Sequence, residues 1–171
     1  MMESLILGGT VIAFAGAVGT DLIISAVQTT SRGVINGINY IYSSDRTGAD
    51  HIKLVLIKLD IMTKVAIINS FINELNEDSE QLESITTSLI SVENVLQNIE
   101  KEIKSVNRII NEHNQKWFAS WRTIDYNHHI EAIRLYNQIL DTRVDLLLKL
   151  LQIGHTTNKS FTKTGMIKQL T

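Results

Sequence analysis

Histidine and glutamate side chains near the predicted end of a helical hairpin are the groups best suited to metal chemistry. An antiparallel hairpin would bring His113 near His128 and His129, with Glu112 and Glu131 close by. Imidazole and carboxylate groups are common ligands of zinc and related metals. The sequence lacks the Glu-x-x-His and His-Glu-x-x-His spacings that place such ligands on one helix face. We therefore expect a capped, aromatic-packed turn here, with a metal site as the alternative.

Aromatic residues gather in the same connection between the two helices. Four of the ten aromatic residues in the chain lie within ten positions of one another. Packed inside the turn, they would cap the hairpin, whereas exposed tryptophans would form a contact surface for a protein or a membrane. The candidate contact surface consists of Trp117, Phe118, Trp121 and Tyr126.

Catalytic and cofactor motifs are not found in the 171 residues. The chain has no cysteine, which excludes thiolate nucleophiles and thiolate zinc sites. It also lacks the glycine spacing of phosphate-binding loops and the Gly-x-Ser-x-Gly nucleophile turn. The net charge of -2 argues against nucleic-acid binding, which requires a basic face. We expect a protein that is not an enzyme, carries no cofactor and binds no nucleic acid.

The N-terminal region is strongly apolar. Asp21 is the only ionisable residue between positions 4 and 31. Residues 5–27 would form a helix of about 34 Å, which exceeds the roughly 30 Å of a bilayer core. The sequence therefore predicts a transmembrane anchor. A cleaved signal peptide and a helix buried in a soluble bundle are the alternatives.

Small side chains recur at every fourth position in this region and would form a ridge against which another helix can pack closely. An acidic residue on that ridge is expected at a helix end or interface, with a buried ion pair or an ion pathway as alternatives. The predicted ridge consists of Gly9, Ala13, Ala17, Asp21, Gly33 and Gly37.

Charge and turn residues divide the remainder of the chain. Four basic residues follow the apolar region between positions 32 and 58, which predicts that the bulk of the chain lies on the cytoplasmic side. We expect an anchor at residues 1–42, a polar linker at 43–50, a helical bundle at 51–153 and a basic tail at 154–171. One helix is expected from position 51 to about 75, and Gly154 is expected to end the last helix.

The clearest periodicity begins at position 82, where apolar residues alternate in steps of three and four over five heptads. Only a coiled-coil seam keeps such positions on one side of a helix, which here would be about 54 Å long. Val95 and Ile109 widen this apolar side, which predicts packing against two helices. The seam consists of Leu82, Ile85, Leu89, Val92, Leu96, Ile99, Ile103, Val106 and Ile110.

A second seam of the same spacing runs from Tyr126 to Leu151 and predicts an antiparallel hairpin with the first. Asn137 occupies a core position of this seam, where a polar residue can select the helix register. Simple exposure of Asn137 is the alternative.

These patterns predict an all-α protein with an apolar anchor and a three-helix, coiled-coil-like bundle. Its expected function is a membrane-associated scaffold that binds lipid and other protein chains as an oligomer. A membrane pore and a soluble helical binding module are the alternatives. The 25 isoleucines and 13 asparagines favour an A/T-rich genome, such as that of a low-GC bacterium, a protist or a large DNA virus. A component of a virion or its envelope would fit this composition.

Overall fold

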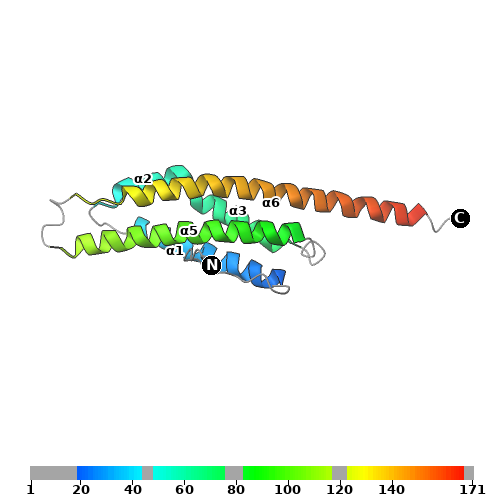
Figure 1. Ribbon diagram of the computed structural model, residues 1–171, viewed down its shortest axis with the longest axis horizontal. Helices are drawn as coiled ribbons and strands as arrows, with labels where there is room; N and C mark the ends of the chain where they lie inside the picture. Colours follow the sequence, from blue (N-terminus) through cyan, green and yellow to red (C-terminus); the bar gives the residue numbers. More distant parts are fainter. Residues whose placement is uncertain (1–18, 44–47, 76–82, 117–122, 168–171) are drawn as a thin grey trace, which may run out of the picture.

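A computed structural model of the chain describes residues 19–43, 48–75, 83–116 and 123–167, with side chains in the last range as far as Ile153. These ranges contain helices and no strand (Figure 1). The predicted all-α fold is therefore confirmed for the part of the chain that the structure describes. The helices are α1 (Thr20–Tyr42), α2 (Asp50–Leu59), α3 (Ile61–Glu74), α5 (Glu83–Asn114) and α6 (Asn127–Ile167).

Helix α1 is amphipathic and packs along α5, although it lies within the expected anchor. The Thr20 and Thr86 hydroxyl oxygens are 3.3 Å apart, and the Tyr40 hydroxyl donates to Asn111 Oδ1 at 3.0 Å. The two helices are therefore parallel, and α1 belongs to the bundle. The expected three-helix bundle therefore also includes α1, and the first of its three expected helices is divided into α2 and α3. The buried face of α1 contains Ile23, Val27, Thr30, Ser31, Val34, Ile38 and Ile41.

No helix in the described ranges has both the length and the hydropathy needed to cross a bilayer. Most of the expected span, residues 5–27, lies outside these ranges. Within its described part, Ile23 and Val27 are buried in the protein core. The predicted transmembrane anchor is therefore unsupported in the described part of the chain, where the buried face of α1 packs against the protein.

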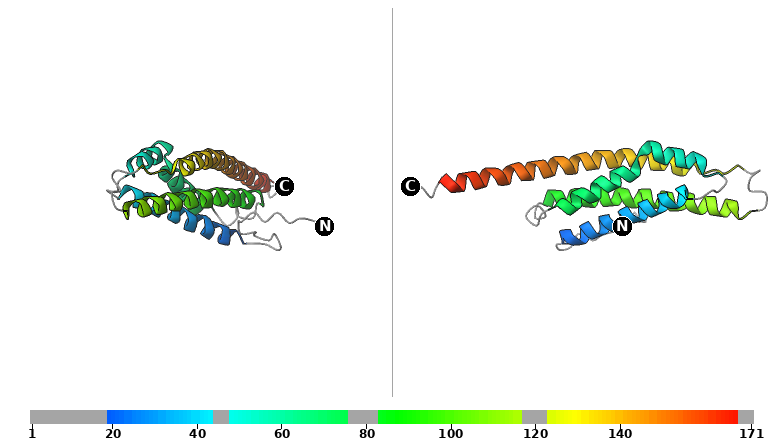
Figure 2. Two further views of the ribbon diagram at one scale, coloured as in Figure 1. Left: turned by 60° about the vertical axis from the view of Figure 1, so that its left-hand side comes forward. Right: turned by 180° about the vertical axis from the view of Figure 1, so that it is seen from behind.

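The expected single helix over residues 51–75 is divided at Asp60. This residue has a left-handed backbone, with φ of 51° and ψ of 36°, and separates α2 from α3. Aspartate tolerates this conformation better than most residues, so no glycine or proline marks the break in the sequence. The bend allows α2 and α3 to contact both α1 and α6 (Figure 2).

Helix α5 lies between α1 and α6 and contacts both along its length. All seam positions in its described range are buried, from Ile85 to Ile110, whereas Leu82 lies outside that range. Val95 is also buried. A broad apolar face of this kind is needed by a helix that packs against two neighbours.

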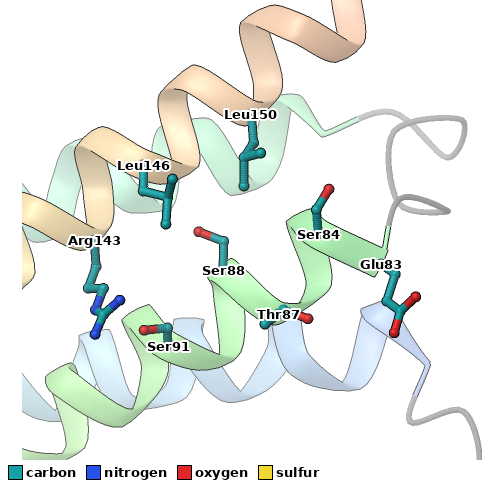
Figure 3. Close-up of a pocket in the computed structure, with 8 residues that line it drawn as sticks. All are labelled: Glu83, Ser84, Thr87, Ser88, Ser91, Arg143, Leu146 and Leu150. Atoms are coloured by element: carbon teal, nitrogen blue, oxygen red, sulfur yellow. The ribbon is translucent and has the colours of Figure 1, made fainter.

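Helix α6 runs antiparallel to α5, since His129 pairs with Glu102 and Leu150 lies opposite Ser84 (Figure 3). It does not end at Gly154 as expected but continues to Ile167. A glycine inside a helix costs only about 1 kcal/mol, and no proline follows it to stop the helix. The C-terminal part of α6 projects beyond the start of α5 (Figure 1).

Candidate helix-docking groove

A groove of about 590 Å³ lies between the first part of α5 and the middle of α6 (Figure 3). Short hydroxyl side chains of α5 form one wall, and two leucines of α6 form the other. An arginine lies at the far end of the groove from the start of α5. The lining residues are Glu83, Ser84, Thr87, Ser88, Ser91, Arg143, Leu146 and Leu150.

The local sequence of α5 explains why the groove is open. Ser84, Thr87, Ser88 and Ser91 are spaced by three, one and three positions, which places them on one side of a helix. Their side chains are too short to fill the space below α6. Leu146 therefore stays 44% exposed although it lies over α5.

Ser88 is the most unusual residue of the groove. Its side chain points from α5 towards Leu146 in Figure 3, and the residue is only 4% exposed. Its Oγ is buried and has no hydrogen-bond partner among the described residues. A buried hydroxyl without a partner costs about 1–3 kcal/mol.

Apolar side chains continue along α6 on either side of the groove. Leu135 is 55% exposed and Ile153 is 61% exposed. Leu135, Leu146 and Ile153 are separated by eleven and seven positions, or about three and two helical turns, and therefore share one face. We call these three residues the α6 apolar stripe. Uncovered apolar surface of this kind is typical of contact sites.

A polar cluster lies inside the bundle, between α1 and α5. Glu93 is buried, accepts a hydrogen bond from Thr30 Oγ1 at 3.4 Å and is bonded to the Gln97 side-chain amide. Burial raises the pKa of Glu93 above its ordinary value, and the two hydrogen bonds offset only part of this effect. These hydrogen bonds satisfy the Glu93 carboxylate, and the bond from Thr30 links α1 to α5. The cluster is therefore part of the packing between these helices, and the groove is the candidate binding site.

The predicted small-residue ridge is only partly described, because Gly9, Ala13 and Ala17 lie outside the described ranges. Gly33 and Gly37 face α5, where a Cβ on Gly37 would lie 2.6 Å from Cγ2 of Ile103. The Asn107 side-chain amide donates to the Gly37 carbonyl oxygen at 3.1 Å. These two glycines therefore permit close packing of α1 on α5.

Asp21, the acidic member of the ridge, is exposed in the first turn of α1. An acidic side chain at that position stabilises the helix by interacting with its positive N-terminal end. This placement agrees with the interpretation of Asp21 as a residue at a helix end.

Asn137 is buried at the contact between α6 and α3. Lys64 Nζ donates to Asn137 Oδ1 at 3.1 Å and lies 2.6 Å from Asp141 Oδ1. The alternative of simple exposure is thus wrong for Asn137. A smaller pocket of about 210 Å³ beside this cluster is lined by Lys64 and Asp141, which already neutralise each other.

The aromatic surface proposed from the sequence is largely outside the described ranges, which exclude Trp117, Phe118 and Trp121. Tyr126 is 4% exposed, and its hydroxyl donates to the Gly48 carbonyl oxygen at 2.5 Å. Burial also raises its pKa. Tyr126 is therefore not part of an exposed surface and instead ties the start of α6 to the start of α2.

The expected cluster of histidines does not form in the described part of the chain. His128 and His129 are adjacent, with ring centroids 5.4 Å apart, and His129 Nδ1 pairs with Glu102 Oε2 at 2.6 Å. His113 lies eleven residues beyond Glu102 in α5, or about 16 Å along the helix. The described residues contain no group of three potential ligands that could hold a metal ion.

The groove could not be predicted from the apolar seam of α5, because its α5 wall lies beside that seam. A signal was available in the four serine and threonine residues beside that seam, between positions 84 and 91. Their shared helix face indicates a strip of short side chains. Only the position of α6 shows that this strip faces leucines across a groove.

Comparison with known proteins finds a similarity to a viral protein. It is similar to an uncharacterized protein of Acanthamoeba polyphaga mimivirus, with 26% identity over 155 residues that cover 75% of this chain and 74% of that protein. No protein-family model matches the chain. No solved structure shows significant similarity to it. The similarity agrees with a large DNA virus, one of the sources favoured by the composition.

Proposed function

We propose that this protein is a helical structural component whose copies assemble through the groove between α5 and α6. The observation that carries the proposal is the uncovered apolar side chain of Leu146, which lines the groove and is 44% exposed. A helix placed in the groove would cover the leucines that line it. The role is proposed as structural rather than catalytic.

The projecting end of α6 supports a second copy as the occupant. Leu150 lies near the first residues of α5, so α6 from Gln152 to Ile167 extends about 24 Å beyond that end of the bundle. Isolated helices of this length are marginal in water and are normally stabilised by packing. Two copies arranged end to end could each place this extension against the groove of the other, which is an isologous contact.

The viral relative supports placing this assembly in a virus particle. The relative is a mimivirus protein that is 26% identical to this chain. We therefore propose the virion as the place of assembly. The proposed assembly depends on contact between protein chains and does not require insertion into a membrane. Attachment to lipid is a separate question that liposome flotation of the full chain answers.

Sedimentation of the full-length protein over a range of concentrations tests the proposal. Assembly predicts that the average mass rises with concentration towards that of two copies. A mass that stays at one copy, about 19.2 kDa, throughout the range would contradict self-assembly.

A further inference from the structure

Helix α6 carries a second row of apolar side chains, in addition to the buried seam that begins at Tyr126. Leu135 and Leu146 are exposed, and Ile139 and Thr142 lie between them, so the row has spacings of four, three and four positions. This alternation keeps the residues on one side of a helix and is typical of a contact with another helix. We call Leu135, Ile139, Thr142 and Leu146 the outer seam of α6.

Thr142 is compatible with an apolar contact, although its side chain is polar. Its hydroxyl donates a hydrogen bond to the Gln138 carbonyl oxygen of the same helix at 3.2 Å. The hydroxyl therefore already has a partner, and the methyl group of Thr142 can contact an apolar side chain without leaving a polar group unpaired.

Four charged residues lie along one flank of the outer seam, within about 60° of one another around the helix axis. They are Glu131, Arg134, Asp145 and Lys149. Their own chain makes little use of these charges. Glu131 Oε1 and Arg134 Nε are 3.5 Å apart, and Asp145 and Lys149 form no ion pair with any described residue. Two acids and two bases are therefore available on an exposed helix flank.

The order of these charges is complementary to its own reverse. Glu131 and Lys149 are placed symmetrically about position 140, and so, to within half a residue, are Arg134 and Asp145. In an antiparallel pair of helices related by a two-fold axis, the same flank of each helix comes together, and residues equally far from the axis face each other. Every acid on this flank would then face a base of the second copy.

The outer seam has the same centre. Leu135 and Leu146 are symmetric about position 140 to within half a residue, as are Ile139 and Thr142. One antiparallel register thus places leucine against leucine and isoleucine against threonine while it pairs the opposite charges. Apolar contacts and charge complementarity, which depend on different residues, select the same register.

We infer that the outer seam of α6 binds the outer seam of a second copy in antiparallel orientation, with a two-fold axis near position 140. The contact covers Leu135 and Leu146, which are exposed in the single chain. Each oppositely charged pair occurs twice, once on either side of the axis. Exposed ion pairs contribute little affinity individually, so their main effect is to select this register and orientation.

This contact is distinct from the groove. Leu146 belongs to both surfaces, but Leu135 and the charged flank do not line the groove. Formation of the outer-seam contact does not depend on the proposed function. A copy that makes both contacts would join a row of copies instead of a closed pair, and this consequence does rest on the proposed function.

Two single-cysteine variants of the full chain test the orientation, since the natural sequence has no cysteine. Thr142→Cys lies near the inferred axis, so its two copies are only about 5 Å apart along the helices. Leu135→Cys is the matched control, because it is also exposed on the outer seam but its two copies are about 16 Å apart along the helices. A short bifunctional thiol reagent should join two chains in the first variant and leave the second as single chains.

The mass of the product distinguishes the outcomes. Crosslinks between chains in both variants would show a parallel contact, because parallel helices place each position opposite itself. Crosslinks in neither variant would show that the outer seams do not meet. Either result overturns the inference, as does a crosslink in Leu135→Cys alone.

Charge reversal in the Thr142→Cys chain gives a test of the register. Glu131→Lys places like charges in both copies of the pair with Lys149 and should lower the rate of crosslinking roughly tenfold at low salt. Lys149→Glu should have the same effect. The variant with both reversals should recover the original rate, because each pair is again oppositely charged. A double variant as slow as the single ones would overturn the inferred register.

Leu135→Glu separates this contact from assembly through the groove. It places a charge on the outer seam but leaves every residue that lines the groove unchanged. Leu135→Glu should therefore abolish the Thr142→Cys crosslink and still increase in mass with concentration. A Thr142→Cys crosslink together with a constant single-copy mass for Leu135→Glu would contradict the proposed function alone. Concentration-dependent assembly without any Thr142→Cys crosslink would contradict the outer-seam contact alone.

Discussion

Lys64 Nζ in α3 lies 3.1 Å from Asn137 Oδ1 in α6 and donates a hydrogen bond to it. The same amino group forms an ion pair with Asp141, one turn further along α6. Asn137 is only 5% exposed, so its amide oxygen has little access to water. This contact fixes the position of α3 along α6, because a shift of either helix would separate the buried amide from its donor.

The Lys64–Asn137 contact predicts a coupled effect of substitutions. Lys64→Met should lower the free energy of unfolding by about 1–3 kcal/mol, because it leaves a buried acceptor without this donor. Asn137→Leu in the same chain should recover part of that loss. Urea unfolding of the two single variants and the double variant measures the coupling. Strictly additive losses would show that the two side chains act independently.

The two glycines of α1 predict substitutions of unequal cost. A Cβ on Gly37 would meet the branched side chain of the buried Ile103, so Gly37→Ala should destabilise the protein by about 1–3 kcal/mol. A Cβ on Gly33 would meet only the flexible carboxylate end of Glu100. Gly33→Ala should therefore stay within about 1 kcal/mol of the wild type, since alanine also favours the helix. Thermal or urea unfolding measures both, and equal losses would be evidence against close packing at Gly37.

Glu93 predicts a pH-dependent contribution to stability. Its raised pKa means that the folded protein binds this proton more tightly than the unfolded chain does. Its contribution therefore becomes more favourable as the pH falls through the raised pKa, and the gain is complete below the ordinary value of about 4.3. Glu93→Gln should raise the free energy of unfolding at about pH 7 and have little effect below about pH 4.

Urea unfolding at both pH values checks this expectation. The matched control is Glu131→Gln, because Glu131 is exposed on α6 and its carboxylate is not buried. The same stability change for Glu93→Gln at both pH values would show that burial does not disfavour the charged form.

The sequence allowed the helical class and the pairing of α5 with α6 to be predicted, because both depend on local periodicity. The seam from Ile85 to Ile110 places its apolar residues on one side of the helix, which requires a partner helix. Position 137 could likewise be placed in a core seam from its spacing alone. The residue that donates a hydrogen bond to Asn137 could not be identified from the sequence, because Lys64 is 73 residues away in the chain.

Hydropathy alone does not decide whether the N-terminal region enters a membrane or a protein core. A lipid bilayer and a protein core both accept apolar residues, so a charge-poor sequence does not by itself distinguish them. The spacing of Ile23, Val27, Val34 and Ile38 contained the relevant signal, since it places one apolar face on α1. The break at Asp60 and the groove beside Ser88 depend on contacts between distant segments, which a single sequence does not display.

Sedimentation of two matched variants tests the central claim that copies assemble through the groove. Leu146→Glu places a charge in the groove, whereas Leu54→Glu places the same charge on a similarly exposed leucine of α2. Assembly through the groove predicts that Leu146→Glu stays at the mass of one copy while Leu54→Glu and the wild type increase in mass with concentration. Equal assembly by all three proteins would contradict the account.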